Sequence, residues 1–228
     1  MLHLKAVLLA LAAGQLGIAI PSGTSETTAG ATTKYCDVST TICYAEYTSP
    51  ANVIYRIALP DTATTASPFD ILLQIIAPRT VGWAAVAWGG QMAYNPLTVA
   101  WPNGNSTIVS SRRATGHILP GTYPGATYAT LPGSKTNATH WQLDVLCSGC
   151  SQWTDQNGKA VALNPAGTSV PLAYGSSVRA VTDPSNNASR FSAHDSKGRW
   201  LQDLNSAKIA NFTSLVHAYA NAVEVSAT

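Results

Sequence analysis

Short runs of apolar and β-branched residues, separated by turns that contain proline and glycine, recur along most of this 228-residue chain. Such runs predict strands, and closely spaced strands without intervening helical segments favour an antiparallel sandwich over a parallel α/β fold. The sequence shows no internal repeat that would indicate a solenoid. We therefore predict an all-β, immunoglobulin-like antiparallel β-sandwich. The expected strands lie at 53–59, 69–76, 81–88, 97–101, 107–111, 141–147 and 177–181.

Two further elements are expected near the ends of this domain. Residues 35–47 have the pattern of a hairpin, with Ser39-Thr40-Thr41 near its turn. From Asp203 onward the apolar residues are spaced as on one face of a helix. We expect a short C-terminal helix there, which either packs against a sheet or begins a linker. Its expected face consists of Leu204, Ile209, Phe212, Leu215, Val216 and Tyr219.

The N-terminus has the pattern of a secretory signal peptide. Lys5 supplies the positive charge, and Ala6 to Ile20 form an apolar run followed by small residues. The run is too short for a membrane span, so we expect a secreted, extracellular protein. Whether the chain is self-standing or a piece of a larger flavoenzyme is left open. The expected organisation is a signal peptide at 1–20, a Ser/Thr-rich lead-in at 21–33, one domain at 34–220 and a tail at 221–228.

The charge of the chain points to no polyanionic partner. Thirteen Lys and Arg against eleven Asp and Glu give a formal net charge of +2. So small a balance favours neither nucleic acid nor an anionic membrane as a partner. Four N-glycosylation sequons would suit an exported chain and would add solubility. They begin at Asn105, Asn137, Asn187 and Asn211.

Two motifs carry candidate chemistry. Met92, the only methionine besides Met1, follows a Gly-Gly pair at the end of the apolar run 81–88, so we expect it in a loop at the mouth of a sheet. A thioether can fill a gap in a core, which is its commoner use, or bind haem iron as a soft axial ligand. The second motif is Phe191-Ser192-Ala193-His194-Asp195-Ser196, which contains a candidate imidazole ligand.

These motifs resemble the haem-b cytochrome domain of fungal cellobiose dehydrogenases. The resemblance extends from about Tyr35 to Leu204. In that family one Met and one His hold the iron, which implies Met92 and His194 as the ligands here. It also implies haem b bound at one end of the sandwich, where two loops meet. The matching stretches include Gly82-Trp83, Trp88-Gly89-Gly90, Met92, Tyr94 to Val99, Trp101 to Gly104, Ser110 to Arg112, Ala114 to Gly116, Asn137 to Trp141 and His194 to Ser196.

Several residues around these ligands have more than one reading. Asp195 either orients the imidazole of His194 through the second ring nitrogen or belongs to a turn. The candidates for an apolar wall, which are otherwise plain core residues, are Trp83, Val86, Trp88 and Val99. The candidate partners for the haem propionates are Arg112, Arg113, Arg179, Arg190, Arg199 and His117, and the sequence does not choose among them. Among the other histidines, His140 is expected to start a strand at the surface and His217 to lie on the exposed side of the helix.

The cysteines are expected to form two disulfides in an exported chain. Three pairings of Cys36, Cys43, Cys147 and Cys150 are open, and local pairing of 36 with 43 and 147 with 150 is preferred. Covalent haem attachment requires His directly after the second cysteine of a C-x-x-C motif, and here Ser151 follows. A thioredoxin-like role would need a βαβ setting. We therefore expect a structural disulfide and a non-covalent haem.

The resemblance implies an extracellular electron-transfer protein. Its expected partners are a flavin- or quinone-dependent sugar dehydrogenase as donor, and a lytic polysaccharide monooxygenase or ferric iron as acceptor. With both axial positions of the iron filled, we do not expect a stand-alone enzyme. An alternative is a secreted carbohydrate-binding β-sandwich without haem, whose exposed tryptophans stack on sugars. A sandwich without any ligand is a third reading, which the Gly-Gly-x-Met context argues against.

Overall fold

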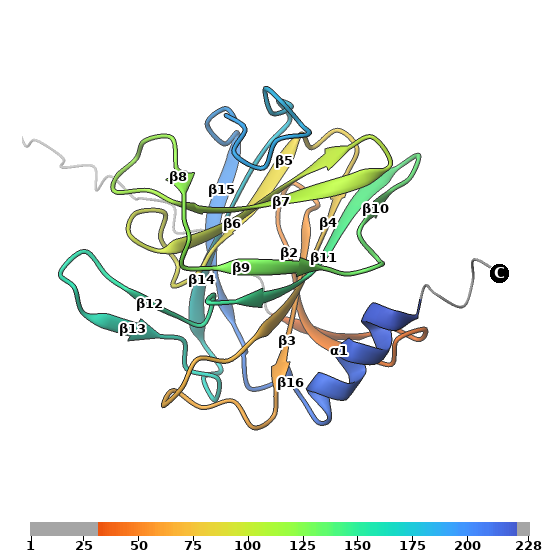
Figure 1. Ribbon diagram of the computed structural model, residues 1–228, viewed down its shortest axis with the longest axis vertical. Helices are drawn as coiled ribbons and strands as arrows, with labels where there is room; N and C mark the ends of the chain where they lie inside the picture. The colour runs from red at the N-terminus through yellow and green to blue at the C-terminus, as the bar shows by residue number, and fades with distance from the viewer. Residues whose placement is uncertain (1–31, 223–228) are drawn as a thin grey trace, which may run out of the picture.

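The computed structural model describes residues 32–222, and within them two antiparallel sheets pack face to face (Figure 1). The expected signal peptide and most of the expected lead-in and tail lie outside the described residues. None of the described helical residues forms a helix long and apolar enough to cross a membrane. The predicted antiparallel β-sandwich with one short C-terminal helix is confirmed.

The larger sheet has the strand order β1-β2-β3-β4-β11-β10. β16 pairs with β3 in parallel, and β9 pairs with β11 in antiparallel orientation. The strands of this sheet are β1 (Thr33–Cys36), β2 (Cys43–Thr48), β3 (Ile54–Pro60), β4 (Ile71–Pro78), β9 (Thr127–Thr130), β10 (Lys135–Thr136), β11 (His140–Ser148) and β16 (Lys208–Ile209).

The smaller sheet has the order β15-β14-β5-β6-β7-β8. A separate hairpin, β12–β13, projects from the sandwich at the left of Figure 1. The strands of the smaller sheet and this hairpin are β5 (Trp83–Ala87), β6 (Pro96–Asn103), β7 (Ser106–Arg113), β8 (Gly121–Thr122), β12 (Gln152–Thr154), β13 (Ala160–Ala162), β14 (Val170–Ser177) and β15 (Ser196–Gln202).

The main core lies between the two sheets, where alternate residues of each strand point inward. Trp200 of β15 stacks on Tyr47 of β2, with ring centroids 4.7 Å apart and an interplanar angle of 6°. Tyr55 of β3 stacks on the same indole at 5.5 Å. These aromatic contacts join the edge of the smaller sheet to the larger one, so they fix which face of the smaller sheet remains outside.

The C-terminal helix α1 (Phe212–Asn221) covers the outer face of the larger sheet. Phe212 and Val216 are buried there against Tyr44 of β2 and Leu72 of β4, which confirms this part of the predicted helical face. The predicted start at Asp203 is wrong, because 203–211 form turns and β16. The backbone of β16 pairs with the end of β3 instead of continuing a helix.

Most predicted strands are present, but one was displaced. The expected strand 177–181 is wrong: the strand there is β14 and it ends at Ser177. β15 was not expected, since Ser196, Lys197 and Gly198 have the composition of a turn. The predicted hairpin over 35–47 is confirmed, with Cys36 opposite Cys43.

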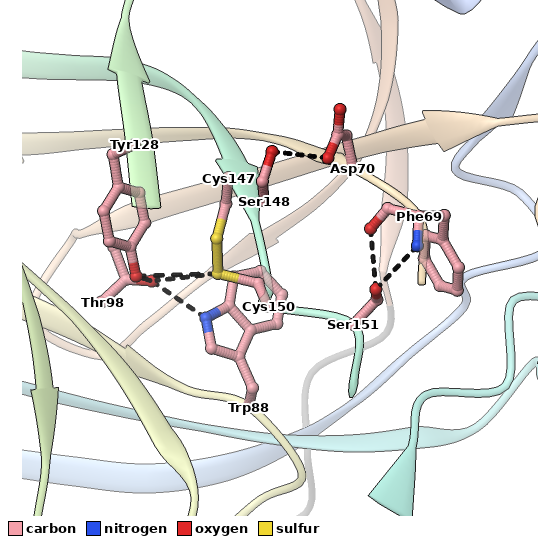
Figure 2. The surroundings of a disulfide bond; sticks show 9 residues. All are labelled: Phe69, Asp70, Trp88, Thr98, Tyr128, Cys147, Ser148, Cys150 and Ser151. Atoms are coloured by element: carbon pink, nitrogen blue, oxygen red, sulfur yellow. Dashed lines mark hydrogen bonds between the residues drawn. A yellow bond between two sulfur atoms is a disulfide. The ribbon is translucent and has the colours of Figure 1, made fainter. Parts of the chain in front are cut away.

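Both expected local disulfides, Cys36–Cys43 and Cys147–Cys150, are present. The second lies fully buried at the end of β11, next to a hydrogen-bonded chain (Figure 2). Trp88 Nε1 donates to Thr98 Oγ1 at 2.9 Å, and Thr98 Oγ1 lies 2.8 Å from the hydroxyl of Tyr128. That hydroxyl is 3.6 Å from Cys150 Sγ. The disulfide is thus a packing element of the inter-sheet core.

Candidate functional site

A second apolar cluster lies outside the sandwich, on the face of the smaller sheet that points away from the larger one. Because directly paired residues share a face, the register assigns this outer face to alternate positions of β5, β6 and β14. We call the cluster the outer apolar face. It consists of Trp83, Ala87, Leu97, Val99, Trp101 and Val181, with Ala85, Met92, Ile108, Ala173 and Phe191 packed against them.

Very small residues occupy the middle of the outer apolar face. Ala85 of β5 pairs with Gly175 of β14, and Ala87 pairs with Ala173. Trp83 and Phe191 stand to one side, with ring centroids 5.0 Å apart and an interplanar angle of 58°. Four small residues in two adjacent pairs leave a shallow bed, so a flat apolar group can approach the backbone of the sheet.

The ring of His194 lies beside Gly175, at one edge of this bed. A Cβ placed on Gly175 would lie 3.5 Å from His194 Cδ2 and 3.7 Å from Trp83 Cη2. Both distances are ordinary van der Waals contacts, so an alanine at 175 would just fit and any larger side chain would displace the imidazole. The half-buried His194 is therefore held at the edge of the bed, beside Trp83.

Met92 reaches the same face from the β5–β6 connection. Gly89 and Gly90 have φ values of 83° and 84°, which glycine adopts without steric cost. The far side of the connection is fixed, since the amide of Tyr94 donates to Ala114 O at 2.7 Å. The resulting tight loop brings the half-buried Met92 against the outer apolar face. Met92 therefore lies in a loop beside a sheet, as expected.

The two candidate ligands approach from opposite ends of the strands, which corrects the expectation that their loops meet at one end. β5 and β15 both pair antiparallel with β14, so they run in the same direction. Met92 follows the end of β5, whereas His194 precedes the start of β15. The two side chains consequently flank the bed of small residues along the strand direction.

Asp195 anchors the chain beside His194 instead of orienting its ring. Its Oδ2 accepts hydrogen bonds from Ser177 Oγ at 2.6 Å and from the amide of Val178 at 3.1 Å, and its own amide donates to Ser176 O at 2.8 Å. These donors, the hydroxyl of Ser177 first, lower the pKa of the Asp195 carboxyl. The turn interpretation is therefore the one that the geometry supports.

Arg112 of β7 is buried and binds the segment that leads to His194. Its side chain lies on the outer side of β7, is 3% exposed and packs 5.4 Å from the ring centroid of Phe191. The guanidinium donates to the carbonyl oxygens of Pro120 at 3.1 Å, Asn187 at 3.0 Å and Ser189 at 2.6 Å. Arg112 thus binds backbone carbonyls, and the expectation that it partners a propionate is not supported by these contacts.

The remaining propionate candidates differ in placement. Arg113 donates to the carbonyl oxygens of Tyr94 and Thr154. Arg199 is exposed and pairs with Ala173, and Lys197 pairs with Gly175, so both lie on the face of the bed. Lys197 was not among the expected partners of the propionates. The other candidates, Arg179, Arg190 and His117, are exposed in loops.

The expected apolar wall is half right. Trp83 and Val99 belong to the outer apolar face, whereas Val86 and Trp88 lie in the core between the sheets. Trp101 and Phe191 complete the outer cluster and were missed. The period of the strand could have found Trp101, because it lies two residues after Val99 and four after Leu97. His140 and His217 are exposed, as expected.

The donor set suits haem better than a bare metal ion. Within residues 32–222, no three His, Cys, Asp or Glu side chains gather as ligands for an ion. One thioether and one imidazole beside an apolar bed match a macrocycle, which brings four nitrogens of its own and needs only two axial donors. The bed of alanine and glycine also fits the flat, apolar shape of a porphyrin.

The family model for the cytochrome domain of cellobiose dehydrogenase matches residues 35–214. The chain belongs to this family. Domains of this type bind haem b, which agrees with the donor set and the bed described above. The chain is thus a cytochrome domain of the kind found in sugar dehydrogenases.

Individual relatives support the same fold. A pyrroloquinoline quinone-dependent pyranose dehydrogenase of Coprinopsis cinerea is 25% identical over 199 residues, which are 86% of this chain and 27% of that protein. The chain therefore spans about a quarter of the length of this relative. The crystal structure of the cytochrome b domain of pyranose dehydrogenase from the same organism aligns with a TM-score of 0.76 at 22% identity, covering 84% of this chain and 97% of that one. The cytochrome domain of Myriococcum thermophilum cellobiose dehydrogenase gives 0.71 at 25% identity, covering 82% and 96%.

Proposed function

We propose that this chain is an extracellular electron-transfer domain that holds haem b between Met92 and His194. The observation that carries the proposal is their position on either side of the bed formed by Ala85, Ala87, Ala173 and Gly175. Haem b, when bound, supplies a one-electron couple between ferrous and ferric iron. Export by the segment 1–20 and glycosylation at the sequons belong to the same proposal.

The protein side chains set the properties of the site. Met92 offers a thioether, which favours the ferrous state relative to a second imidazole. Met92 and His194 would supply the two protein ligands of the iron, which would leave no open coordination position for a small molecule such as oxygen. Trp83 and Phe191 pack on each other beside the bed, where they would exclude water from one side of the macrocycle, and Asp195 holds the backbone of His194 through β14. Little rearrangement of these residues is needed between two oxidation states.

Lys197 and Arg199 are the cations that we assign to the propionates. Both are exposed on β15, opposite Gly175 and Ala173 respectively. Their side chains flank the bed on the face where a haem edge would meet solvent. Guanidinium groups bind carboxylates through paired hydrogen bonds, and an ammonium group binds them as a point charge.

Purified protein is expected to contain one non-covalent, low-spin haem b. Cys150 is disulfide-bonded and is followed by Ser151, so neither C-x-x-C sulfur is available for a thioether link to the macrocycle. The check is an absorption spectrum before and after acid–acetone extraction. Pigment that stays with the polypeptide would contradict the mode of binding. A colourless protein would instead favour the haem-free carbohydrate-binding alternative.

For partners, we propose a flavin- or quinone-dependent sugar dehydrogenase as donor and a lytic polysaccharide monooxygenase as acceptor. The near-balanced charge of the chain favours brief docking at local patches over long-range steering. Stopped-flow absorbance should show rapid haem reduction by a dehydrogenase with its sugar, then reoxidation by the monooxygenase. Rates equal to those in buffer would overturn the shuttle assignment, even in a protein that contains haem.

A further inference from the structure

A cleft separate from the proposed haem site lies between the β12–β13 hairpin, the start of β14 and the β5–β6 connection. Its volume is about 460 Å³, within the range of about 300–1,000 Å³ that is usual for small-molecule sites. Neither Met92 nor His194 lines it. The hairpin that forms its outer wall is the one that projects from the sandwich in Figure 1.

The walls of the cleft combine neutral polar groups with apolar surface. The polar side chains are Gln91, Asn95, Asn164 and Ser169, and Asp155 contributes the only charge among the lining residues. Val161, Leu163 and Pro171 supply apolar surface. Amides and hydroxyls both donate and accept hydrogen bonds, so such a lining selects a neutral ligand that carries many hydroxyl groups.

Two buried residues in this lining carry polar side-chain groups, and one of these groups has no hydrogen-bond partner. Trp153 is 6% exposed, and its indole N–H has no hydrogen-bond partner among the described residues. Asn95 is 5% exposed, and its side-chain amide adds a polar group to the same lining. A buried donor without a partner is costly, and a ligand or a water that reached the Trp153 N–H would relieve that cost.

The cleft is also preformed. A Cβ on Gly89 would come within 2.6 Å of the Trp153 ring and 2.8 Å of Asn95 Nδ2, and a Cβ on Gly90 within 2.9 Å of Pro171 Cβ. The Gly-Gly backbone therefore packs directly on the residues of the opposite wall. Lining residues that are already packed in place lose little conformational entropy when the cleft binds a ligand.

We propose that this cleft binds a saccharide, with pyranose C–H faces against the apolar wall and hydroxyl groups against the amides. A pyranose is a neutral molecule that carries both apolar C–H faces and hydroxyl groups. It therefore matches the lining better than an anion or a positively charged peptide. The proposal does not depend on the haem. If no saccharide binds, the absorption spectrum of the haem is unaffected. If the protein is colourless, saccharide binding in the cleft is still expected.

Isothermal titration of the purified protein with cellobiose, xylobiose and maltose as separate probes tests this proposal. At least one disaccharide should bind saturably. Ser169→Arg, at an exposed cleft position, should weaken binding at least about tenfold by filling the space. Trp153→Phe retains the packing but loses the N–H, so it should weaken binding by up to about tenfold.

Thr168→Arg is the matched control, because Thr168 is exposed next to Ser169 and does not line the cleft. It should bind as the parent protein does. The proposal is overturned if none of the three disaccharides binds saturably. It is equally overturned if Ser169→Arg binds as the parent does, or if Thr168→Arg loses binding to the same extent.

Discussion

Replacing His194 with glycine should lower haem affinity by at least about 100-fold, because even residues that merely support a metal ligand are worth about 10- to 100-fold. The imidazole lies beside Gly175, and the anchoring hydrogen bonds of Asp195 involve no atom of the His194 side chain. The fold around the site should therefore survive the substitution. The measurement is haem transfer to apomyoglobin, followed by absorbance.

Free imidazole distinguishes a ligand role of His194 from a merely structural role. It should enter the space left in His194→Gly and restore a six-coordinate, low-spin spectrum. His117→Gly is the matched control, since His117 is an exposed loop histidine. Equal loss of haem in both variants, or no response to imidazole, would contradict the assignment of His194.

Met92→His separates the role of the second ligand. It should keep a six-coordinate haem while lowering the reduction potential by on the order of 100 mV, since imidazole favours the ferrous state less than a thioether does. Spectroelectrochemical titration measures the potential. A variant with the potential of the parent protein would show that Met92 only fills space on the outer apolar face.

The strands that the sequence predicted well are those whose inward residues are large. Most residues of β4 are apolar, and in β11 the large apolar residues alternate with Gln142 and Asp144, so both patterns are unambiguous. β14 was misplaced for a physical reason. Its outward residues include Ala173 and Gly175, which stay small because the bed lies there. The same feature that makes the site therefore weakens the strand signal.

The motifs single out Met92 and His194 as candidate ligands, but they do not show how the two residues are arranged in the fold. Met92 and His194 lie 102 positions apart in the chain, and only the register of β5, β14 and β15 shows that they flank one face. β15 itself was hidden because Lys197 and Gly198 resemble a turn. β15 is an edge strand, where a lysine side chain can point outward and stay exposed. The strand therefore tolerates Lys197 and Gly198.

Some long-range contacts around the site leave no sequence signal at all. Arg112 lies in a strand whose buried and exposed residues alternate in the usual way. Nothing in the neighbouring sequence indicates that it donates hydrogen bonds to carbonyl groups some 75 positions later. The helix start was misjudged for a related reason. Leu204 is fully buried and matches a helical period, but its burial comes from a turn that packs on the main core.

Arg112→Met should lower the free energy of unfolding by roughly 3 kcal/mol, since buried carbonyl groups that lose a charged donor cost about 1–3 kcal/mol each and water replaces part of the loss. Burial lowers the pKa of the Arg112 guanidinium, yet an arginine stays protonated in proteins. The carbonyls of Pro120, Asn187 and Ser189 thus solvate a buried cation, and they also fix the segment that ends at Phe191.

The consequence should extend to the haem, because Phe191 packs on Trp83 and the chain then continues to His194. We expect Arg112→Met to release haem faster and Arg112→Lys to recover only part of the stability, since one ammonium cannot span three carbonyls. Arg190→Met, at an exposed position in the same segment, is the matched control and should change stability by less than about 0.5 kcal/mol. Urea unfolding and haem-transfer rates measure both effects. If Arg112→Met matched Arg190→Met in both, the segment before His194 would have to be held by other contacts.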